Sequence, residues 1–358
     1  MSYILNLLLA LVLLHLKFAG AWTVCWTCVS RDRIVSPAFG IELTPSYSTA
    51  AVRHHNGSVA SLIKIDTLPD FKDLLRELDT SSASHHGLFE NQIPLVTQSL
   101  IEQLVYFISF ELSRVQDAVF NRYGIEIDRA AIVLPRLGSL EHWIIPEILA
   151  NASMLAGIRD VFATYPYSMY PDLVGFAAAG MGLGLCEDYV ELDRCAAEEM
   201  RLPEKMVYGV EFTNVSLRFG LASFQASESA FEWAWRWRWD LGLDAREEMG
   251  GQRWSGLVED ALKEMLDWSQ GDFTDLILMG EAALDRGFIK ALRRALGENV
   301  PKGFEHWERP TVKTWDGSEL DLTFTASLGA AEIAKRVMES PDGCLEQPYC
   351  KLWRCLIG

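Results

Sequence analysis

The fold class of this chain is decided by residues 38–52, AFGIELTPSYSTAAV. An apolar run covers Ala38 to Leu43, a Thr-Pro-Ser turn follows at residues 44–46, and a second apolar run covers Thr49 to Val52. Two such runs on either side of a turn are typical of a β-hairpin. The sequence therefore predicts that a strand pair opens the folded domain.

Strand-like and helix-like segments alternate along the rest of the chain. Leu100, Leu104, Ile108 and Leu112 recur at helical spacing within one long segment. We expect helices over residues 94–123, 145–157, 254–268, 286–296 and 325–337, and strands over 130–134, 158–162, 206–210, 215–221 and 275–279. This alternation predicts an α/β architecture with parallel pairing. Two halves that each open with a strand pair also suggest an internal duplication.

The first residues have the features of a secretory signal. Ile4 to Leu16 is an almost continuous apolar run, and Ala19-Gly20-Ala21 supplies the small residues that signal peptidase needs. Because a membrane span needs about 20 apolar residues, the run predicts a cleaved signal and a mature chain that begins at Trp22. An uncleaved signal anchor is the alternative. No transmembrane segment is expected after cleavage.

Sequons and cysteines agree with export to the endoplasmic reticulum lumen or the cell exterior. N-glycosylation sequons begin at Asn56, Asn151 and Asn214. The seven cysteines lie mostly near the two ends of the chain, where disulfides could fasten loose termini. The predicted disulfide candidates are Cys344 with Cys350 and, next, Cys25 with Cys28. A redox function of the Cys25–Cys28 motif is the alternative, and no spacing typical of a metal site is present.

The charge balance disfavours polyanionic partners. With 32 Lys and Arg against 49 Asp and Glu, the formal net charge is −17. A field of this sign repels nucleic acid and anionic membranes, and it also makes ATP harder to attract. We therefore expect no nucleic-acid partner.

Four motifs, in family order, resemble the nucleotide-binding domain shared by actin and the seventy-kilodalton heat-shock chaperones. They are residues 40–48 (GIELTPSYS), 130–135 (AAIVLP) with 156–158 (AGI), 276–283 (LILMGEAA) and 327–331 (SLGAA). The closest likeness is to signal-bearing fungal proteins of actin-like ATPase type. The resemblance implies a two-lobed α/β fold, each lobe a mixed sheet with flanking helices. The implied boundaries are 1–21 for the signal, 22–35 for a Cys-containing segment, 36–205 and 206–340 for the lobes, and 341–358 for a Cys-rich tail.

The phosphate loops of that family are degenerate in this chain. In the first loop Glu42 stands where the family has Asp, and Pro45 removes a backbone N–H that would bind phosphate. In the second loop the family's metal-site Asp aligns with Tyr208 or Gly209, and Glu211 replaces part of a glycine run. Remnants of the nucleotide loops are Thr44, Ser46, Tyr47, Gly280 and Glu281. Binding of ATP with Mg²⁺ is therefore disfavoured, and no other cofactor is expected.

No catalytic residue can be assigned from these loops, and the only candidates are Glu42 and Glu211. They are interpreted either as solvated carboxylates at loop ends or as an acidic cleft. In such a cleft, two carboxyl groups raise each other's pKa and act as acid and base.

A second feature is the aromatic stretch of residues 231–239, FEWAWRWRW. If it is extended, Trp233, Trp235, Trp237 and Trp239 share one face; if it is helical, they spread over half the circumference. The aromatic surface either packs between subdomains or forms a platform for an apolar small molecule or a protein partner.

These observations predict a non-hydrolysing binding or scaffold protein of the secretory pathway. The first alternative is an enzyme that re-uses the cleft for an organic substrate in fungal secondary-metabolite biosynthesis. The second is a weak ATPase.

Overall fold

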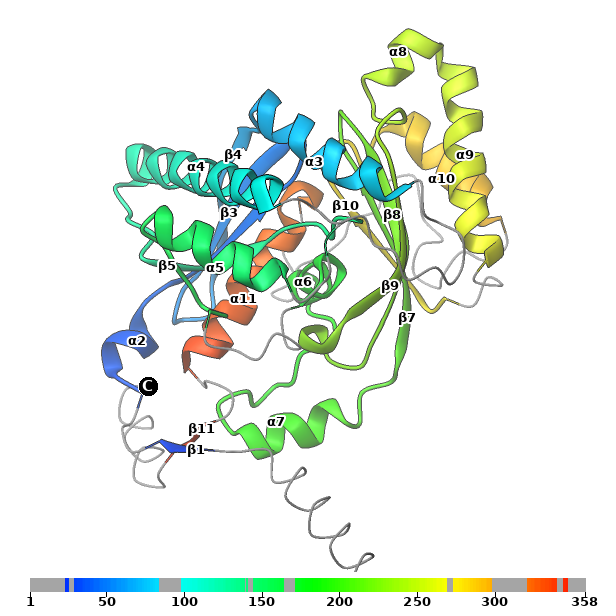
Figure 1. Ribbon diagram of the computed structural model, residues 1–358. Coiled ribbons are helices and arrows are strands. Elements are labelled where there is room, and N and C mark those ends of the chain that lie inside the picture. The colour runs from blue at the N-terminus through cyan, green and yellow to red at the C-terminus, as the bar shows by residue number, and fades with distance from the viewer. Residues whose placement is uncertain are drawn as a thin grey trace, which may run out of the picture.

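The computed structural model describes residues 23–25, 29–83, 98–138, 140, 144–163, 171–268, 273–297, 321–339 and 344–346. Figure 1 shows two larger β-sheets with helices on their outer faces and two helices between them. The predicted α/β class with parallel pairing is confirmed. The arrangement is compatible with two lobes.

The first sheet has the strand order β4-β3-β2-β5-β6. Its strands are β2 (Ala38–Leu43), β3 (Tyr47–Arg53), β4 (Val59–Asp66), β5 (Arg129–Val133) and β6 (Arg159–Asp160). The first three are antiparallel neighbours, and β5 and β6 join in parallel on the free side of β2. The outer face carries α3 (Pro69–Ala83), α4 (Gln98–Tyr123) and α5 (Ile145–Leu155) (Figure 1).

The second sheet repeats this order without a fifth strand, as β9-β8-β7-β10. Its strands are β7 (Lys205–Phe212), β8 (Leu217–Phe224), β9 (Phe231–Arg238) and β10 (Asp275–Met279). Again three antiparallel strands are followed by one that joins the first in parallel. Beside this sheet lie α8 (Ala245–Met249), α9 (Gly251–Trp268) and α10 (Arg286–Leu296). The shared strand order agrees with the internal duplication that the sequence suggests.

Two helices, α6 (Leu173–Gly180) and α11 (Thr325–Glu339), pack against each other between the sheets. Small residues make this possible. A Cβ on Gly329 would lie 1.7 Å from the Phe176 carbonyl oxygen, and one on Gly180 would lie 2.1 Å from the Thr325 oxygen. Although α11 comes from the segment predicted as the second lobe, it packs on β2, β3 and β5 of the first sheet. The last helix therefore crosses back to the first half.

Smaller elements complete the described chain. They are β1 (Thr23–Cys25), α2 (Arg31–Val35), α7 (Leu192–Glu199), the short 3-10 helices η2 (Ser227–Ser229) and η3 (Leu322–Phe324), and β11 (Cys344–Glu346). Strand β1 pairs in parallel with β11, so segments from the two ends of the chain lie together. No helix in the described ranges is long and apolar enough to span a membrane.

The aromatic stretch is a strand, β9, as in the extended interpretation. Its register pairs Ala222 with Glu232 and Leu221 with Ala234, so Trp233 is the extra residue of a β-bulge. The expectation that all four Trp side chains share one face is wrong for this reason. Trp233 is 38% exposed, whereas Trp237 is 8% exposed and packs into the hydrophobic core of the first sheet.

Trp239, just past β9, joins the two halves of the molecule. Its Nε1 donates a hydrogen bond to Asp79 Oδ2 in α3 at 2.9 Å, and its ring stacks on Trp237 with centroids 4.6 Å apart. Trp235 and Trp239 both pack against the first-sheet core, as Trp237 does. These three side chains fit the interpretation of packing between subdomains.

We predict that Trp239→Phe lowers the free energy of unfolding by about 2 kcal/mol, because a partly buried hydrogen bond to a carboxylate is lost. The matched variant Trp233→Phe alters a half-exposed bulge residue and should cost less than about 1 kcal/mol. Urea unfolding of both variants measures the difference. Equal losses would show that the contact with Asp79 does not stabilise the fold.

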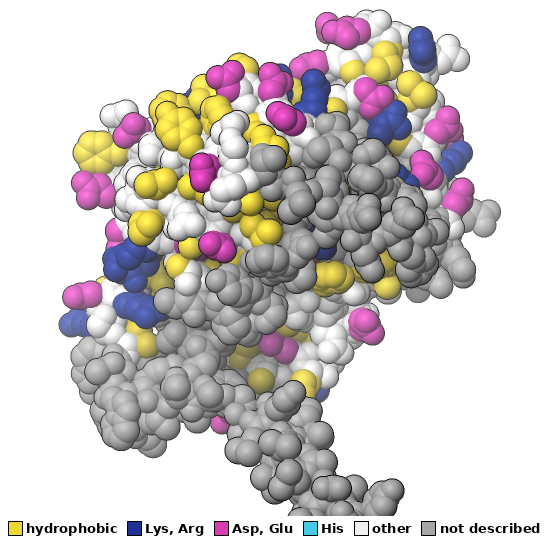
Figure 2. Space-filling view, in the orientation of Figure 1, with side chains coloured by type: hydrophobic (Ala, Val, Ile, Leu, Met, Phe, Trp, Pro, Cys, Tyr) yellow, Lys and Arg dark blue, Asp and Glu magenta, His cyan; other side chains and the backbone are white. Residues whose placement is uncertain are grey.

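The surface agrees with the acidic composition. Figure 2 shows acidic side chains spread over the described part of this face, and hydrophobic side chains gathered over α4. The exposed aromatic residues of α4 are Tyr106, Phe110, Phe120 and Tyr123.

Candidate functional site

The site lies where the first hairpin of each sheet turns. The two hairpins carry the same pattern, Gly-x-Glu-x-Thr, at residues 40–44 and 209–213. Glu42 pairs with Thr49 and Val133 on the neighbouring strands; Glu211 pairs with Arg218 and Met279 at the corresponding places. The two glutamates are therefore equivalent residues of the two sheets.

Both glycines of the pattern allow a helix to approach its strand closely. A Cβ on Gly40 would lie 2.1 Å from the Ser327 carbonyl oxygen in α11, and one on Gly209 would lie 2.7 Å from Val174 in α6. Because side chains alternate along a strand, the glutamate two residues later points to the same inner face. Glu42 and Glu211 thus face the space between the sheets.

In both turns the threonine forms hydrogen bonds with the third residue after it, Tyr47 in the first and Ser216 in the second. In the first, Thr44 Oγ1 accepts from the backbone N–H groups of Ser46 at 3.2 Å and Tyr47 at 3.0 Å. In the second, Thr213 Oγ1 accepts from the Ser216 N–H at 3.1 Å. These threonines use backbone donors that could otherwise bind an anion. The glycine-rich geometry of a phosphate loop is therefore absent from both described turns.

This internal equivalence gives a different match for the second loop from the two family alignments. The alignments with Tyr208 and Gly209 placed no carboxylate at the position of the family's Asp. The internal repeat instead matches Glu211 with Glu42, and Tyr208 lies on the opposite face, in the outer core of the second sheet. The repeated Gly-x-Glu-x-Thr pattern is the feature of the sequence that could have shown the match between Glu42 and Glu211.

Glu42 is a buried carboxyl group at 1% exposure. The Thr49 hydroxyl lies 3.2 Å from Glu42 Oε2 and 3.1 Å from Ser327 Oγ. Burial, and then the Glu211 carboxyl, raise the pKa of Glu42 well above its ordinary value, against a smaller opposing effect of Thr49. The interpretation as a solvated carboxylate is wrong for this residue.

Glu211 is buried to the same degree, at 2% exposure, and neither of its carboxyl oxygens has a hydrogen-bond partner. Arg218, its neighbour in β8, forms an ion pair with Glu232 of β9 instead. Burial raises the pKa of Glu211 to about 7; Arg218 lowers it and Glu232 raises it. The interpretation as a solvated loop-end carboxylate is wrong here too, because Glu211 lies inside β7.

Glu281 joins the two turns from a third loop, which follows β10. Its Oε1 accepts hydrogen bonds from the Ser46 hydroxyl of the first turn and, at 3.3 Å, from the Asn214 N–H of the second. Its Oε2 forms an ion pair with Lys64 of β4. One protein carboxylate therefore occupies the point where donors of both hairpins meet.

Gly280 sets the direction of this loop. It has a φ of 101°, and a Cβ there would lie 2.3 Å from the Phe212 carbonyl oxygen. Only glycine tolerates both conditions. The Ala282 N–H donates to that same oxygen at 3.1 Å, which anchors the loop to the second hairpin.

Tyr47 lies among these acidic groups. Its ring is buried, its hydroxyl has no hydrogen-bond partner, and Lys64 Nζ lies 5.3 Å from the ring centroid. Burial raises the pKa of Tyr47 well above its ordinary value, and the Glu42, Glu211 and Glu281 carboxyl groups add to the effect. All the sequence-predicted loop residues are thus near one another.

The arrangement limits what chemistry the site can do. Two carboxyl groups with raised pKa values are suited to acid–base work, but both oxygens of Glu211 are closed off from solvent. A substrate cannot reach them without movement of the surrounding strands. Among the described residues, the only acidic, Cys and His side chains grouped closely enough for a metal ion are Cys186, Cys195 and Glu199, outside this site.

The other predicted positions lie elsewhere. Asn56 and Asn151 are exposed, and Asn214 is half-buried in the second turn. Two sets of predictions lie outside the residues that the structure describes: the predicted signal, residues 1–21, and the side chains of Cys25, Cys28, Cys344 and Cys350. In the described part, Cys186 and Cys195 form a disulfide that the sequence analysis did not select.

Comparison with known proteins assigns no family to this chain. No protein-family model matches the sequence, and no curated protein is detectably similar to it.

Proposed function

We propose that this chain is a non-hydrolysing binding or scaffold protein of the secretory pathway. Its fold would be that of the actin and heat-shock-chaperone nucleotide-binding domain. The proposal rests on the repeated sheets, the equivalent hairpins and the position of Glu281.

The fold part of the proposal is supported by topology. Each sheet begins with an antiparallel meander and adds a parallel strand beside its first strand. Helices α6 and α11 cross between the sheets. The family resemblance in the sequence implies two related lobes of this kind, with ligand-binding hairpins facing each other.

The loss of nucleotide chemistry is supported mainly by Glu281. Its carboxylate accepts from Ser46 and Asn214, so the donors of the two turns already hold an anion. A phosphate in the same place would be repelled by the negative charge of the Glu281 carboxylate. At 4 Å two like unit charges repel by about 4 kcal/mol at intermediate dielectric, roughly half the binding free energy of a micromolar ligand.

Thermal unfolding with Mg-ATP tests this proposal. A ligand that binds the folded state raises the melting temperature with the logarithm of its concentration over its Kd. We expect millimolar Mg-ATP to leave the melting temperature within about 1 °C of the value with Mg²⁺ alone. A rise of several degrees that needs the nucleotide would contradict the proposal and favour the weak-ATPase alternative.

A matched pair of variants separates charge from shape. Glu281→Gln keeps the size of the side chain but removes its charge, so any residual affinity for inorganic pyrophosphate should increase in this variant. Glu248→Gln removes the same charge from an exposed position in α8 and should have no effect. Equal binding by both variants would show that Glu281 does not exclude anions.

A further inference from the structure

The Cys186–Cys195 disulfide lies beside α11, away from the hairpins. It closes the loop that leads into α7, where Cys195 is located. Cys186 is 3% exposed, whereas Cys195 is half-buried and closer to solvent. A thiol from solution therefore reaches Cys195 more easily than Cys186.

The two sulfurs have opposite electrostatic surroundings. Arg336 Nη1 of α11 lies 3.4 Å from Cys186 Sγ and 2.8 Å from the Cys186 carbonyl oxygen. Cys195 Sγ instead lies 3.5 Å from a carboxylate oxygen of Glu199. A thiolate is thus stabilised at Cys186 and destabilised at Cys195.

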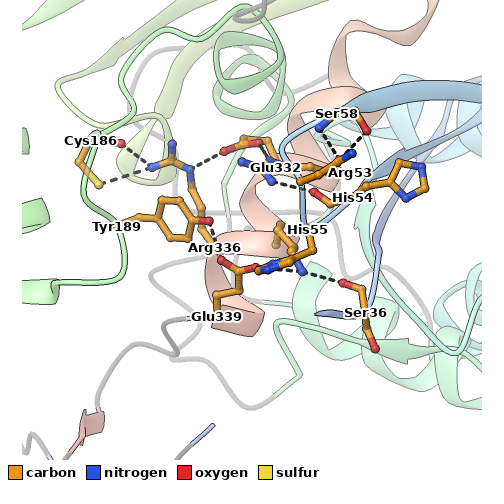
Figure 3. Close-up of polar contacts among 12 residues, drawn as sticks. Ser36, Arg53, His54, His55, Ser58, Cys186, Tyr189, Glu332, Arg336 and Glu339 are labelled. Carbon is orange, nitrogen blue, oxygen red and sulfur yellow. Dashed lines mark hydrogen bonds and ion pairs between the residues drawn. The ribbon is translucent and has the colours of Figure 1, made fainter. Parts of the chain in front are cut away.

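Arg336 is held firmly in this position. Figure 3 shows its guanidinium group between Cys186 and Glu332, whose Oε1 accepts from Arg336 Nε at 2.8 Å. The guanidinium carbon of Arg336 also lies 4.7 Å from the centroid of the Tyr189 ring. Tyr189 belongs to the disulfide-closed loop, and its hydroxyl donates to Glu339 Oε2 at 2.6 Å. The loop itself therefore helps to place the cation beside the sulfur.

In thiol–disulfide exchange the better leaving sulfur is the one whose thiolate is more stable. Solvent access and charge both favour attack at Cys195. Attack there releases Cys186 as the leaving sulfur, beside Arg336. The same contact would keep Cys186 ionised for the reverse reaction.

We propose that Cys186–Cys195 is an exchangeable disulfide that thiols attack at Cys195. The thiolate of the incoming thiol, having lost its proton to solvent, forms a bond with Cys195 Sγ. The Cys186–Cys195 bond breaks, and Cys186 leaves as a thiolate beside Arg336. In the reverse step Cys186 attacks the mixed disulfide, re-forms the bond and releases the thiol.

Reduced glutathione is the probe for this site. The full chain with its disulfide formed is exposed to glutathione, quenched with iodoacetamide and mapped by mass spectrometry. We expect glutathione on Cys195 and the alkyl group on Cys186. Glutathione mainly on Cys186, equal labelling of both, or no adduct at either cysteine would overturn the proposal.

Charge variants test the part played by Arg336. Arg336→Gln should slow exchange roughly threefold to tenfold, because the leaving thiolate loses its cation. Arg336→Lys keeps a cation beside the sulfur and should restore much of the rate. An unchanged rate in Arg336→Gln would contradict the mechanism.

If Arg336→Gln does not fold, a measurement on the wild-type chain tests the same proposal. In the glutathione adduct, the pH dependence of Cys186 alkylation should give a thiol pKa below the ordinary value of about 8.5. A value at or above the ordinary one would also overturn the proposal.

Discussion

Gly329→Ala should destabilise the protein by about 3 kcal/mol or more, although it adds a single methyl group. The new Cβ would lie 1.7 Å from the Phe176 carbonyl oxygen and 2.6 Å from the Gly180 nitrogen. Both are backbone atoms of α6, so a rotamer change cannot relieve the overlap. Helices α6 and α11 would have to separate, which is why the cost lies at or above the upper end for overpacked cores.

A matched control is available in α9. Gly256 also lies inside a helix, but a Cβ there would meet nothing within 4 Å. Because alanine is the better helix former, Gly256→Ala should raise stability by about 0.5–1 kcal/mol. Urea unfolding of the two variants compares the same substitution at a contact and in open space. A small loss in Gly329→Ala would mean that the helices do not cross at this residue.

Glu211→Gln should stabilise the protein at neutral and alkaline pH. The pKa of Glu211 is about 7 in the folded state against an ordinary value of 4.5, so the folded protein binds the proton more tightly. The contribution of Glu211 to stability is therefore fully present below about pH 4.5 and is lost as pH rises through about 7. A shift of this size corresponds to ~3 kcal/mol.

The expected result is a difference that depends on pH. Near pH 4 the variant and the wild type should be about equally stable, and near pH 8 the variant should be more stable by ~3 kcal/mol. Glu248→Gln, at an exposed position, should give a profile parallel to that of the wild type. A Glu211→Gln profile that is also parallel would show that Glu211 ionises as freely as an exposed residue.

Much of the fold was predictable because local patterns agree with it. Helix α10 begins at Arg286 and ends at Leu296 as expected, and β10 covers the predicted residues 275–279. The register of β9 was not predictable. The bulge that displaces Trp233 depends on how β8 pairs with it, and this is a contact between segments.

The candidate site was predictable in its residues but not in its arrangement. The sequence selected Glu42, Glu211, Ser46 and Glu281, yet it gave no reason for one carboxylate to bridge two turns. That contact between Ser46 and Glu281 joins positions 235 residues apart. Likewise, α6 packs against Gly209 on the face of β7 that carries Glu211, and no local pattern encodes this contact between distant segments.

The most direct test of the central claim is a crystal structure of the protein crystallised in the presence of millimolar Mg-ATP. The account predicts that the Glu281 carboxylate accepts from the Ser46 hydroxyl and the Asn214 N–H, with no nucleotide between the hairpins. A triphosphate bound to those two donors, with Glu281 displaced, would contradict it.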